Sequence, residues 1–345
     1  MNFLLSEEQT QVVDSLRHLL VDQMPVARFR PPAPQVGNSD QAFWPRLGEL
    51  GFLGIALPES DGGIGLTAAE EMLAYREFGR HLLSPAILGL TLGAQLAARP
   101  RPDMLEGILR GQLPIALANP RGAVQLGETC HGQFHLVDAK HAEWVLICTA
   151  DGAALLRRTD FTAVTDVAAT DHVLSLERGT LAGARPACWR AASTESLYPR
   201  AQLLVSAYAV GLAEATRDMA VEYAKTRQQF GKPIGSFQAI KHLCADMAIR
   251  AEAATCQVIF AALVQAEARS GADFHSTAAK LVAVQAALDN AAQNIQVHGA
   301  IGFTAEADAH LFIKRAHVLE QLWGDTRQQR RLMLAAAYPD GDESS

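Results

Sequence analysis

The chain has 345 residues, 49% of them hydrophobic and 19% charged, so it can bury a large core in two or three domains. Its net charge of −7 and its pI near 5.9 argue against nucleic acid as the main partner. The five cysteines are odd in number and lack C-x-x-C spacing, which fits a reduced cytosol and predicts no metal site.

The start of the chain is not expected to be an export signal. Its first nine residues are acidic where a secretory signal would be basic. No uncharged apolar run approaches the length that spans a membrane. We therefore expect a soluble, cytoplasmic protein without a membrane span.

Residues 1–112 are predicted to form an N-terminal α-helical domain. Ser6 and Gln9 have the spacing of a capping box, and apolar residues then recur at helical intervals as far as Leu20. Thr67 is expected to cap a later helix. The Gly-rich loop before it, Ser60–Leu66, lacks the strand and the lysine of a P-loop, so we interpret it as a turn between helices and not as a phosphate cradle.

Residues 113–192 lose the helical period and indicate a reduced middle β domain. Trp144–Cys148 is an apolar run typical of a buried strand, and Phe134–Val137 alternates weakly. Gly, Thr and Asp punctuate the remaining stretches at strand-length intervals.

Residues 193–338 predict a C-terminal four-helix bundle, and 339–345 a tail. The helices are expected at about 196–229, 236–269, 275–297 and 305–337. The first has a small, apolar centre at Ala207–Ala213, as close helix packing requires.

The fourth predicted helix carries basic residues at roughly helical spacing. They are His310, Lys314, Arg315 and His317. This spacing predicts a basic face, which is either solvated or turned toward phosphate groups.

The connection between the first two bundle helices carries a candidate site. Gly231 and Ser236 are typical signals for the end of one helix and the start of the next. Arg227, placed on the last helical turn, presents a guanidinium fork that pairs with phosphate or carboxylate. The alternative is a solvated arginine favoured by the helix dipole.

Three motifs resemble those of the acyl-CoA dehydrogenase family. Residues 227–238 resemble R-x-x-F-G-x-x-I/L-x-x-F/H-Q, residues 50–65 resemble L-G-x-x-G-I/L-x-x-P-E-x-x-G-G-x-G, and residues 296–300 resemble Q-x-x-G-G. The resemblance covers most of the chain. It implies a mainly α fold with an N-terminal helical domain, a middle β-barrel, and a four-helix bundle that also forms the contacts between subunits.

The resemblance also implies an FAD site. Arg227 and Phe230 would hold the pyrophosphate side of FAD, with Gln238 and Gln296 nearby. Gly299 would let the backbone come close to the adenosine diphosphate half. In family dimers these residues serve a flavin seated in the neighbouring subunit. His298 is interpreted as a packing or hydrogen-bonding residue, and a direct role in the site is the alternative.

The middle domain departs from the family. There, segments of the types T-E-x-x-A-G-S-D and W-I-T-N contact the flavin ring. Ala116–Val124 stands in place of the first segment, and no equivalent of the second is found. We therefore expect a trimmed barrel that lacks its half of the flavin site.

The catalytic base of the family is also missing. The family places a glutamate either in Y-E-G-T near the C-terminus or in E-R at the start of the first bundle helix. Trp323 and Ala201 occupy these two positions here, and a one-residue slip of the alignment would put Gly324 in place of Trp323. Asp325 is the nearest carboxylate, but it is displaced, and a helix cap or an ion pair is its alternative role. We accordingly predict no catalytic residue in this chain.

Three functions remain open. The chain is a base-lacking subunit of a heteromeric acyl-CoA dehydrogenase, a self-sufficient flavoenzyme with a displaced base such as Asp325, or a flavin-free structural subunit. The resemblance to the short subunit of steroid-degradation heteromers favours the first. It implies an α2β2 assembly with a full-length paralogue, FAD, an acyl-CoA substrate, and electron-transfer flavoprotein as acceptor.

Overall fold

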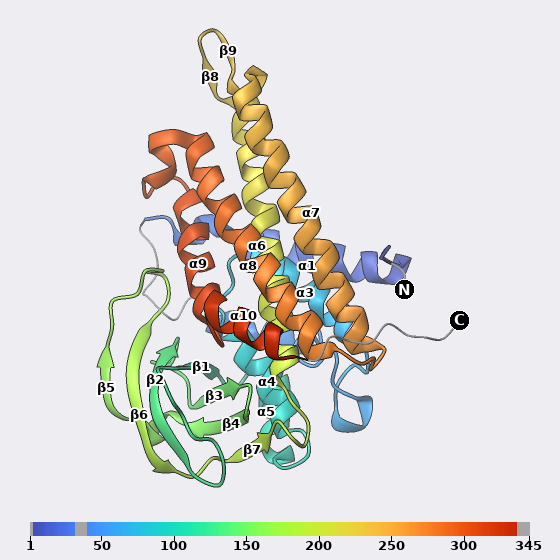
Figure 1. Cartoon of the computed structure of the whole chain (residues 1–345), viewed down its shortest axis with the longest axis vertical. Helices are drawn as coiled ribbons and strands as arrows, with labels where there is room; N and C mark the ends of the chain where they lie inside the picture. The colour runs from blue at the N-terminus through green and yellow to red at the C-terminus, as the bar shows by residue number, and fades with distance from the viewer. Residues whose placement is uncertain (1–2, 32–39, 337–345) are drawn as a thin grey trace. The chain divides into compact units, whose positions relative to one another are not determined.

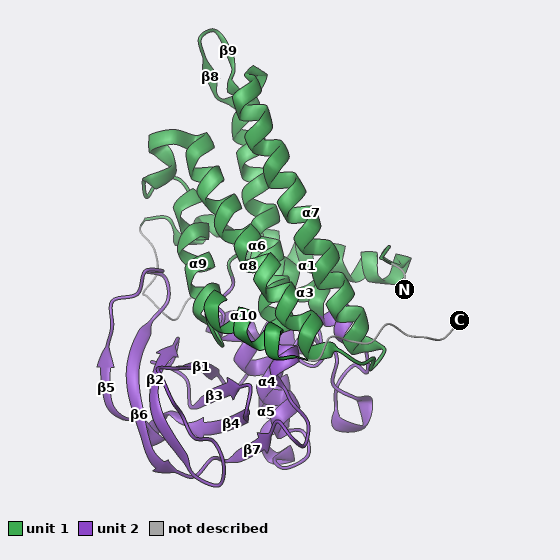
Figure 2. Ribbon diagram, in the orientation of Figure 1, with its two compact units in different colours: residues 1–33, 72–82, 202–345 green, residues 34–71, 83–201 purple. Residues whose placement is uncertain are grey.

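The computed structural model describes residues 3–31 and 40–336, and within them the chain is mainly α-helical with one seven-stranded sheet (Figure 1). It divides into two compact units, green and purple in Figure 2. Unit 1 consists of Met1–Ala33, Met72–Leu82 and Gln202–Ser345, and unit 2 of Pro34–Glu71 and Leu83–Ala201. The expected order of helices, sheet and helices along the chain is confirmed. The domain limits at 112, 192 and 338 stay predictions, and the tail 339–345 lies outside the described residues.

Unit 2 combines short helices with the sheet. Its helices are α2 (Trp44–Glu49), α4 (Ile87–Ala97) and α5 (Pro102–Leu109). The strands are β1 (Ile115–Pro120), β2 (Cys130–Val137), β3 (Trp144–Thr149), β4 (Gly152–Arg157), β5 (Thr162–Asp166), β6 (Leu176–Ala184) and β7 (Cys188–Ala191). Their order is β5-β6-β2-β1-β3-β4-β7, antiparallel except for the parallel pair β1–β3. The two predicted strands are confirmed as parts of β2 and β3.

Alternation along the strands gives the sheet two different faces. One face carries an apolar core that includes Phe134, Leu136, Val145 and Ile147. On the other face α4 packs against β1, β3, β4 and β7, and its glycines come close to Ile115. This second face becomes polar and more exposed along β2 and β6, beyond β1.

Unit 1 contains the long helices. They are α1 (Glu7–Gln23), most of α3 (Ala68–Arg80) and of α6 (Tyr198–Thr226), then α7 (Gln238–Ala266), α8 (Ala272–His298), α9 (Ala309–Gln321) and α10 (Thr326–Ala335). The capping box of Ser6 and Gln9 is present at the start of α1. The fourth predicted bundle helix is two helices in the structure, because residues 322–325 form a turn in which Trp323 and Gly324 have positive φ.

Helices α3 and α6 cross at two glycines. A Cβ added to Gly211 would overlap the carbonyl oxygen of Arg76, and one added to Gly79 would overlap that of Tyr208. Beside the crossing, Arg76 and Arg80 both pair with the buried Glu214, at 2.6 and 3.2 Å. The small centre predicted for the first bundle helix therefore serves a close backbone approach.

The connection between α6 and α7 differs from the prediction. Helix α6 ends at Thr226, three residues earlier than expected, and a hairpin of β8 (Gln228–Gln229) and β9 (Lys232–Pro233) follows. Phe230 and Gly231 form its two-residue turn with φ values of 52° and 78°. Two positive φ angles in a row are typical of a type I′ hairpin turn, which excludes a continuing helix.

Helix α7 is long and apolar enough, by length and composition alone, to cross a membrane. This property of α7 was not expected from the sequence. In its most apolar stretch 44% of the residues are buried, and a core helix of a soluble protein meets the same criteria. The feature alone is weak support for a membrane span.

Candidate functional site

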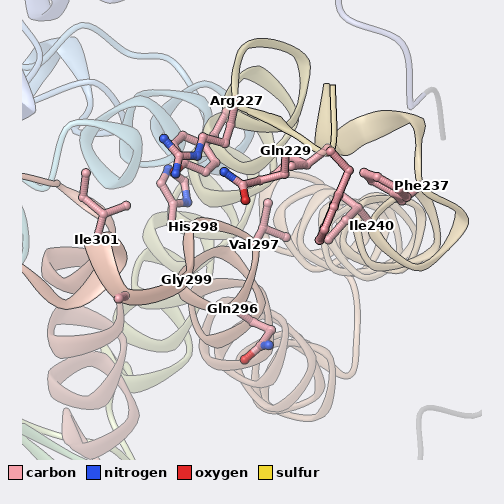
Figure 3. A pocket seen from close by; sticks show the side chains of 13 residues that line it. Arg227, Gln229, Phe237, Ile240, Gln296, Val297, His298, Gly299 and Ile301 are labelled. Atoms are coloured by element: carbon pink, nitrogen blue, oxygen red, sulfur yellow. The ribbon is translucent and has the colours of Figure 1, made fainter. Parts of the chain in front are cut away.

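A pocket of about 490 Å³ lies in unit 1 where the end of α6, the hairpin, the start of α7 and the end of α8 meet (Figure 3). Its volume is within the range of small-ligand sites. Its walls combine apolar side chains with a few polar ones. The predicted residues Arg227, Phe230, Gln296 and Gly299 all line it.

Arg227 is held by its backbone and has an uncommitted side chain. Its N–H donates to the carbonyl of Tyr223, and its own carbonyl accepts from the N–H of Ile234, both at 2.8 Å. Within residues 3–31 and 40–336 the guanidinium makes no hydrogen bond or ion pair. A fixed arginine with five free donors beside a pocket is suited to bind a phosphate group.

Gly299 supplies the turn that ends α8. Its φ of 66° and ψ of −147° lie in a region that essentially only glycine adopts. Apart from its chain neighbours, no described residue has an atom within 4 Å of where a Cβ would stand, so the constraint is conformational and not steric. The exposed backbone at this turn can therefore come close to a ligand.

His298 is fixed on two sides. Its Nδ1 lies 2.8 Å from the carbonyl oxygen of Asn294, which assigns the proton to this nitrogen. Its ring stacks on Tyr223 with centroids 4.1 Å apart, and both rings line the pocket. These contacts describe a packed, hydrogen-bonded histidine on the pocket wall (Figure 3).

Phe230 stands at the tip of the hairpin with 91% of its surface exposed. It meets Phe237 edge to face at 6.2 Å, and the Lys232 ammonium lies 4.5 Å from the centre of the Phe237 ring. Gln238, the first residue of α7, is exposed and is not among the residues that line the pocket. Its assignment to the cofactor therefore stays a prediction without support from the pocket.

Several residues of the pocket wall were not predicted from the sequence. Tyr223, Gln229, Ile234, Phe237 and Ile240 all line it. Phe237 and Ile234 belong to the motif that was recognised. Tyr223 lies one helical turn before Arg227, a spacing that places both side chains on the same face of a helix.

The two residues expected at the family's base positions are buried. Ala201 lies fully buried in α6, and Trp323 is 2% exposed between α9 and α10. The backbone around Trp323 is held by side chains. Lys280 donates to the carbonyls of Leu322 and Gly324, and Gln329 donates to the carbonyl of Trp323 at 2.9 Å.

Asp325 is the N-cap of α10. Its carboxylate accepts a 2.8 Å hydrogen bond from the N–H of Gln328. A carboxylate in this place satisfies a free donor of the helix and complements its dipole. The capping role that was left open is the one the structure displays.

The expected basic face of the fourth helix is wrong for Arg315. This residue is 1% exposed and donates hydrogen bonds to the carbonyl of Leu82 and to the hydroxyl of Tyr208, at 2.9 and 2.7 Å. Burying a guanidinium requires such partners, and helical spacing alone does not reveal them.

Known proteins are similar to this chain in sequence and in fold. The acyl-CoA dehydrogenase N-terminal domain matches residues 6–100, and the acyl-CoA dehydrogenase C-terminal domain matches residues 189–338. Acyl-CoA dehydrogenase IpdE2 of Mycobacterium tuberculosis is 32% identical over 328 residues, which cover 94% of this chain and 96% of the relative.

Two further similarities extend this result. Acyl-CoA dehydrogenase FadE34 of Mycobacterium tuberculosis is 38% identical over 307 residues, 86% of this chain, but this chain spans only 42% of its length. A chain of the ChsE4–ChsE5 complex from Mycobacterium tuberculosis superposes with a TM-score of 0.85 and 25% identity, covering 99% of this chain and 100% of that one. The chain belongs to the acyl-CoA dehydrogenase family.

Proposed function

We propose that this chain is a subunit of an FAD-dependent acyl-CoA dehydrogenase that contacts the diphosphate side of an FAD seated in a partner chain. The partner supplies the catalytic glutamate. The observation that carries this proposal is the pocket in which Arg227, with its uncommitted guanidinium, meets Gln296 and Gly299.

The pocket residues fit the diphosphate half of FAD. Arg227 provides charge-assisted donors for a pyrophosphate, and the exposed Gln296 adds an amide that can donate or accept. The turn at Gly299 leaves room for a ligand beside the backbone. The stacked rings of Tyr223 and His298 give this site an ordered wall.

None of the three candidate residues in this chain is suited to be the base for the reaction. In α,β-dehydrogenation a carboxylate removes the proton at Cα while bound flavin accepts the hydride from Cβ. Trp323 and Ala201 cannot take a proton, and the carboxylate of Asp325 is engaged as a helix cap. This supports a glutamate from the partner over a self-sufficient enzyme.

A full-length paralogue in an α2β2 assembly is the proposed partner. The similarity to a chain of a two-component complex favours a heteromer. Helix α7 offers a surface for it, since Ile249 is 67% exposed among small apolar neighbours such as Ala245 and Ala253. We further propose cytoplasmic location, a bulky acyl-CoA such as a steroid thioester as substrate, and electron-transfer flavoprotein as acceptor.

Flavin stoichiometry tests this function. The chain is purified alone and together with a co-expressed paralogue, and FAD is measured per chain by absorbance. We expect a colourless, inactive chain alone and a yellow complex with one FAD per heterodimer. A yellow, active homo-oligomer with one FAD per chain would overturn the proposal and favour the self-sufficient enzyme.

A further inference from the structure

The sheet of unit 2 presents two adjacent rows of polar side chains on one face, along β1, β2, β6 and β5. Strand register places Asn119, His135, Arg178 and Thr165 in one row and Gln133, Thr180 and Thr162 in the next. Arg121 extends the second row, because its N–H donates to the carbonyl of Gln133 at 2.8 Å. We call these eight residues the polar platform.

The polar platform carries positive charge without compensation. It contains two arginines and a histidine but no carboxylate. Within the described ranges 3–31 and 40–336, neither Arg121 nor Arg178 makes a side-chain hydrogen bond or an ion pair. The nearby carboxylates are engaged elsewhere, Asp166 with Lys140 at 2.7 Å and Glu177 with Arg158 at 2.8 Å.

The two arginines flank His135. Arg178 is its direct cross-strand neighbour, and Arg121 follows two residues after its other neighbour, Asn119. Burial lowers the pKa of His135, and the positive charges of Arg121 and Arg178 lower it further. The three side chains are therefore close enough to interact electrostatically. Arg121 and Arg178 repel each other with no carboxylate among the eight residues to offset them, so a bound anion would stabilise this arrangement.

The spacing suits a single anion. Arg121 and Arg178 are separated by β2 and by one step of two residues, so ideal strand geometry puts their backbones about 12 Å apart. Two arginine side chains extended toward each other can close this gap above His135 and Gln133. Guanidinium forks bind phosphate in a bidentate way, and amide and hydroxyl groups beside them add donors.

We propose that the polar platform is a phosphate-binding site, in which Arg121 and Arg178 hold one phosphate group above His135 and Gln133. The phosphate belongs to the coenzyme A part of the thioester. Naming coenzyme A rests on the proposed function, whereas the phosphate site itself does not. The platform lies between the segments 6–100 and 189–338 that match the family.

The test is calorimetric titration of the full chain with coenzyme A, 3′-dephospho-coenzyme A and pyrophosphate. The double variant R121Q/R178Q is compared with Arg185→Gln, an exposed arginine of the same unit outside the two rows. We expect the double variant to raise the Kd of coenzyme A roughly a hundredfold, about tenfold for each charge-assisted contact. Arg185→Gln should stay within twofold of the wild type.

The three probes separate the sources of the phosphate. Weaker binding of 3′-dephospho-coenzyme A assigns the 3′-phosphate, whereas equal binding together with competition by pyrophosphate assigns the diphosphate. Both variants should fold, because the altered side chains have no hydrogen-bond or ion-pair partner among the residues that the structure describes, and melting temperatures check this. Absence of coenzyme A binding to the wild type, an unchanged Kd in the double variant, or an equal loss in Arg185→Gln would overturn the site.

A separate readout distinguishes this site from the proposed flavin contact. Arg227→Ala should keep coenzyme A binding, because Arg227 lies in the other unit, and R121Q/R178Q should keep the FAD content of the complex. Failure of the flavin assignment alone would leave the phosphate site standing, with its ligand then identified by the titrations.

Discussion

The ammonium group of Lys280 on α8 donates a 2.8 Å hydrogen bond to the backbone carbonyl of Gly324. It also donates to the carbonyl of Leu322, the C-cap of α9, where a cation complements the helix dipole. Between these two carbonyls Trp323 adopts a φ of 54°, which is unfavourable for a side chain of its size. Lys280 thus holds the turn between α9 and α10.

This relationship predicts a pH dependence of stability. Burial lowers the pKa of Lys280 to about 7, although Asp325 and Glu320 raise it in part. Between pH 7 and the usual lysine pKa of about 10.4, the unfolded chain binds a proton that the folded protein lacks. Raising the pH therefore disfavours unfolding, by at most about 1.4 kcal/mol per pH unit for one proton.

Urea unfolding of the wild type and of Lys280→Met at pH 7.5, 8.5 and 9.5 measures this effect. The free energy of unfolding of the wild type should rise relative to that of the variant as the pH increases. Subtracting the variant removes every other titrating group from the comparison. Parallel pH profiles for the two proteins would show that Lys280 does not titrate in this range.

Asp325 caps α10, and we predict that it does not act as the catalytic base. Asn is an equally good N-cap, so Asp325→Asn should keep the stability of the chain and leave turnover of the complex within a few-fold. Asp325→Ala loses the bond to Gln328 and should cost about 1 kcal/mol of stability. A loss of turnover of ~10³ in Asp325→Asn, on the scale of removing a base, would favour the self-sufficient enzyme.

Substitution by alanine should have opposite effects on stability at Gly211, where α3 and α6 cross, and at Gly107, which lies in α5 away from that crossing. Gly211→Ala places a methyl group against the carbonyl of Arg76, and overpacking of this kind costs about 3 kcal/mol. Gly107, in α5, has only ordinary contact with Leu113 at 3.5 Å, so Gly107→Ala should stabilise by about 0.5–1 kcal/mol. Thermal unfolding of both variants checks the prediction, and equal shifts would contradict the close crossing.

Local sequence signals predicted the elements that depend on local physics. The capping box at Ser6, the buried strand from Trp144 and the small centre of α6 all follow from residue type and spacing. Each needs only neighbours along the chain or an apolar face, and such patterns are readable in one sequence.

Features that depend on distant partners were not predicted. The fourth bundle helix breaks at Trp323 because Lys280, more than forty residues earlier, satisfies the carbonyls of the turn. Arg315 is buried because Leu82 and Tyr208 accept its hydrogen bonds. The pocket around Arg227 was predicted through its motif, but Ile240 reaches its wall only through the packing of α7 against α6.

Arg227 gives the most direct test of the candidate site. Its side chain is exposed and makes no hydrogen bond or ion pair within residues 3–31 and 40–336, so Arg227→Ala should leave the melting temperature of the chain unchanged. In the complex with the partner, the variant should weaken FAD retention by roughly 2–3 kcal/mol, the value of charge-assisted bonds to a pyrophosphate. Arg227→Lys keeps the charge but not the planar fork and should recover only part of this loss.

Arg99→Ala, an exposed arginine in unit 2, is the matched control and should retain FAD like the wild type. Titration of the flavin-free complexes with FAD gives the Kd for each variant, and a wild-type Kd in Arg227→Ala would remove Arg227 from the flavin site.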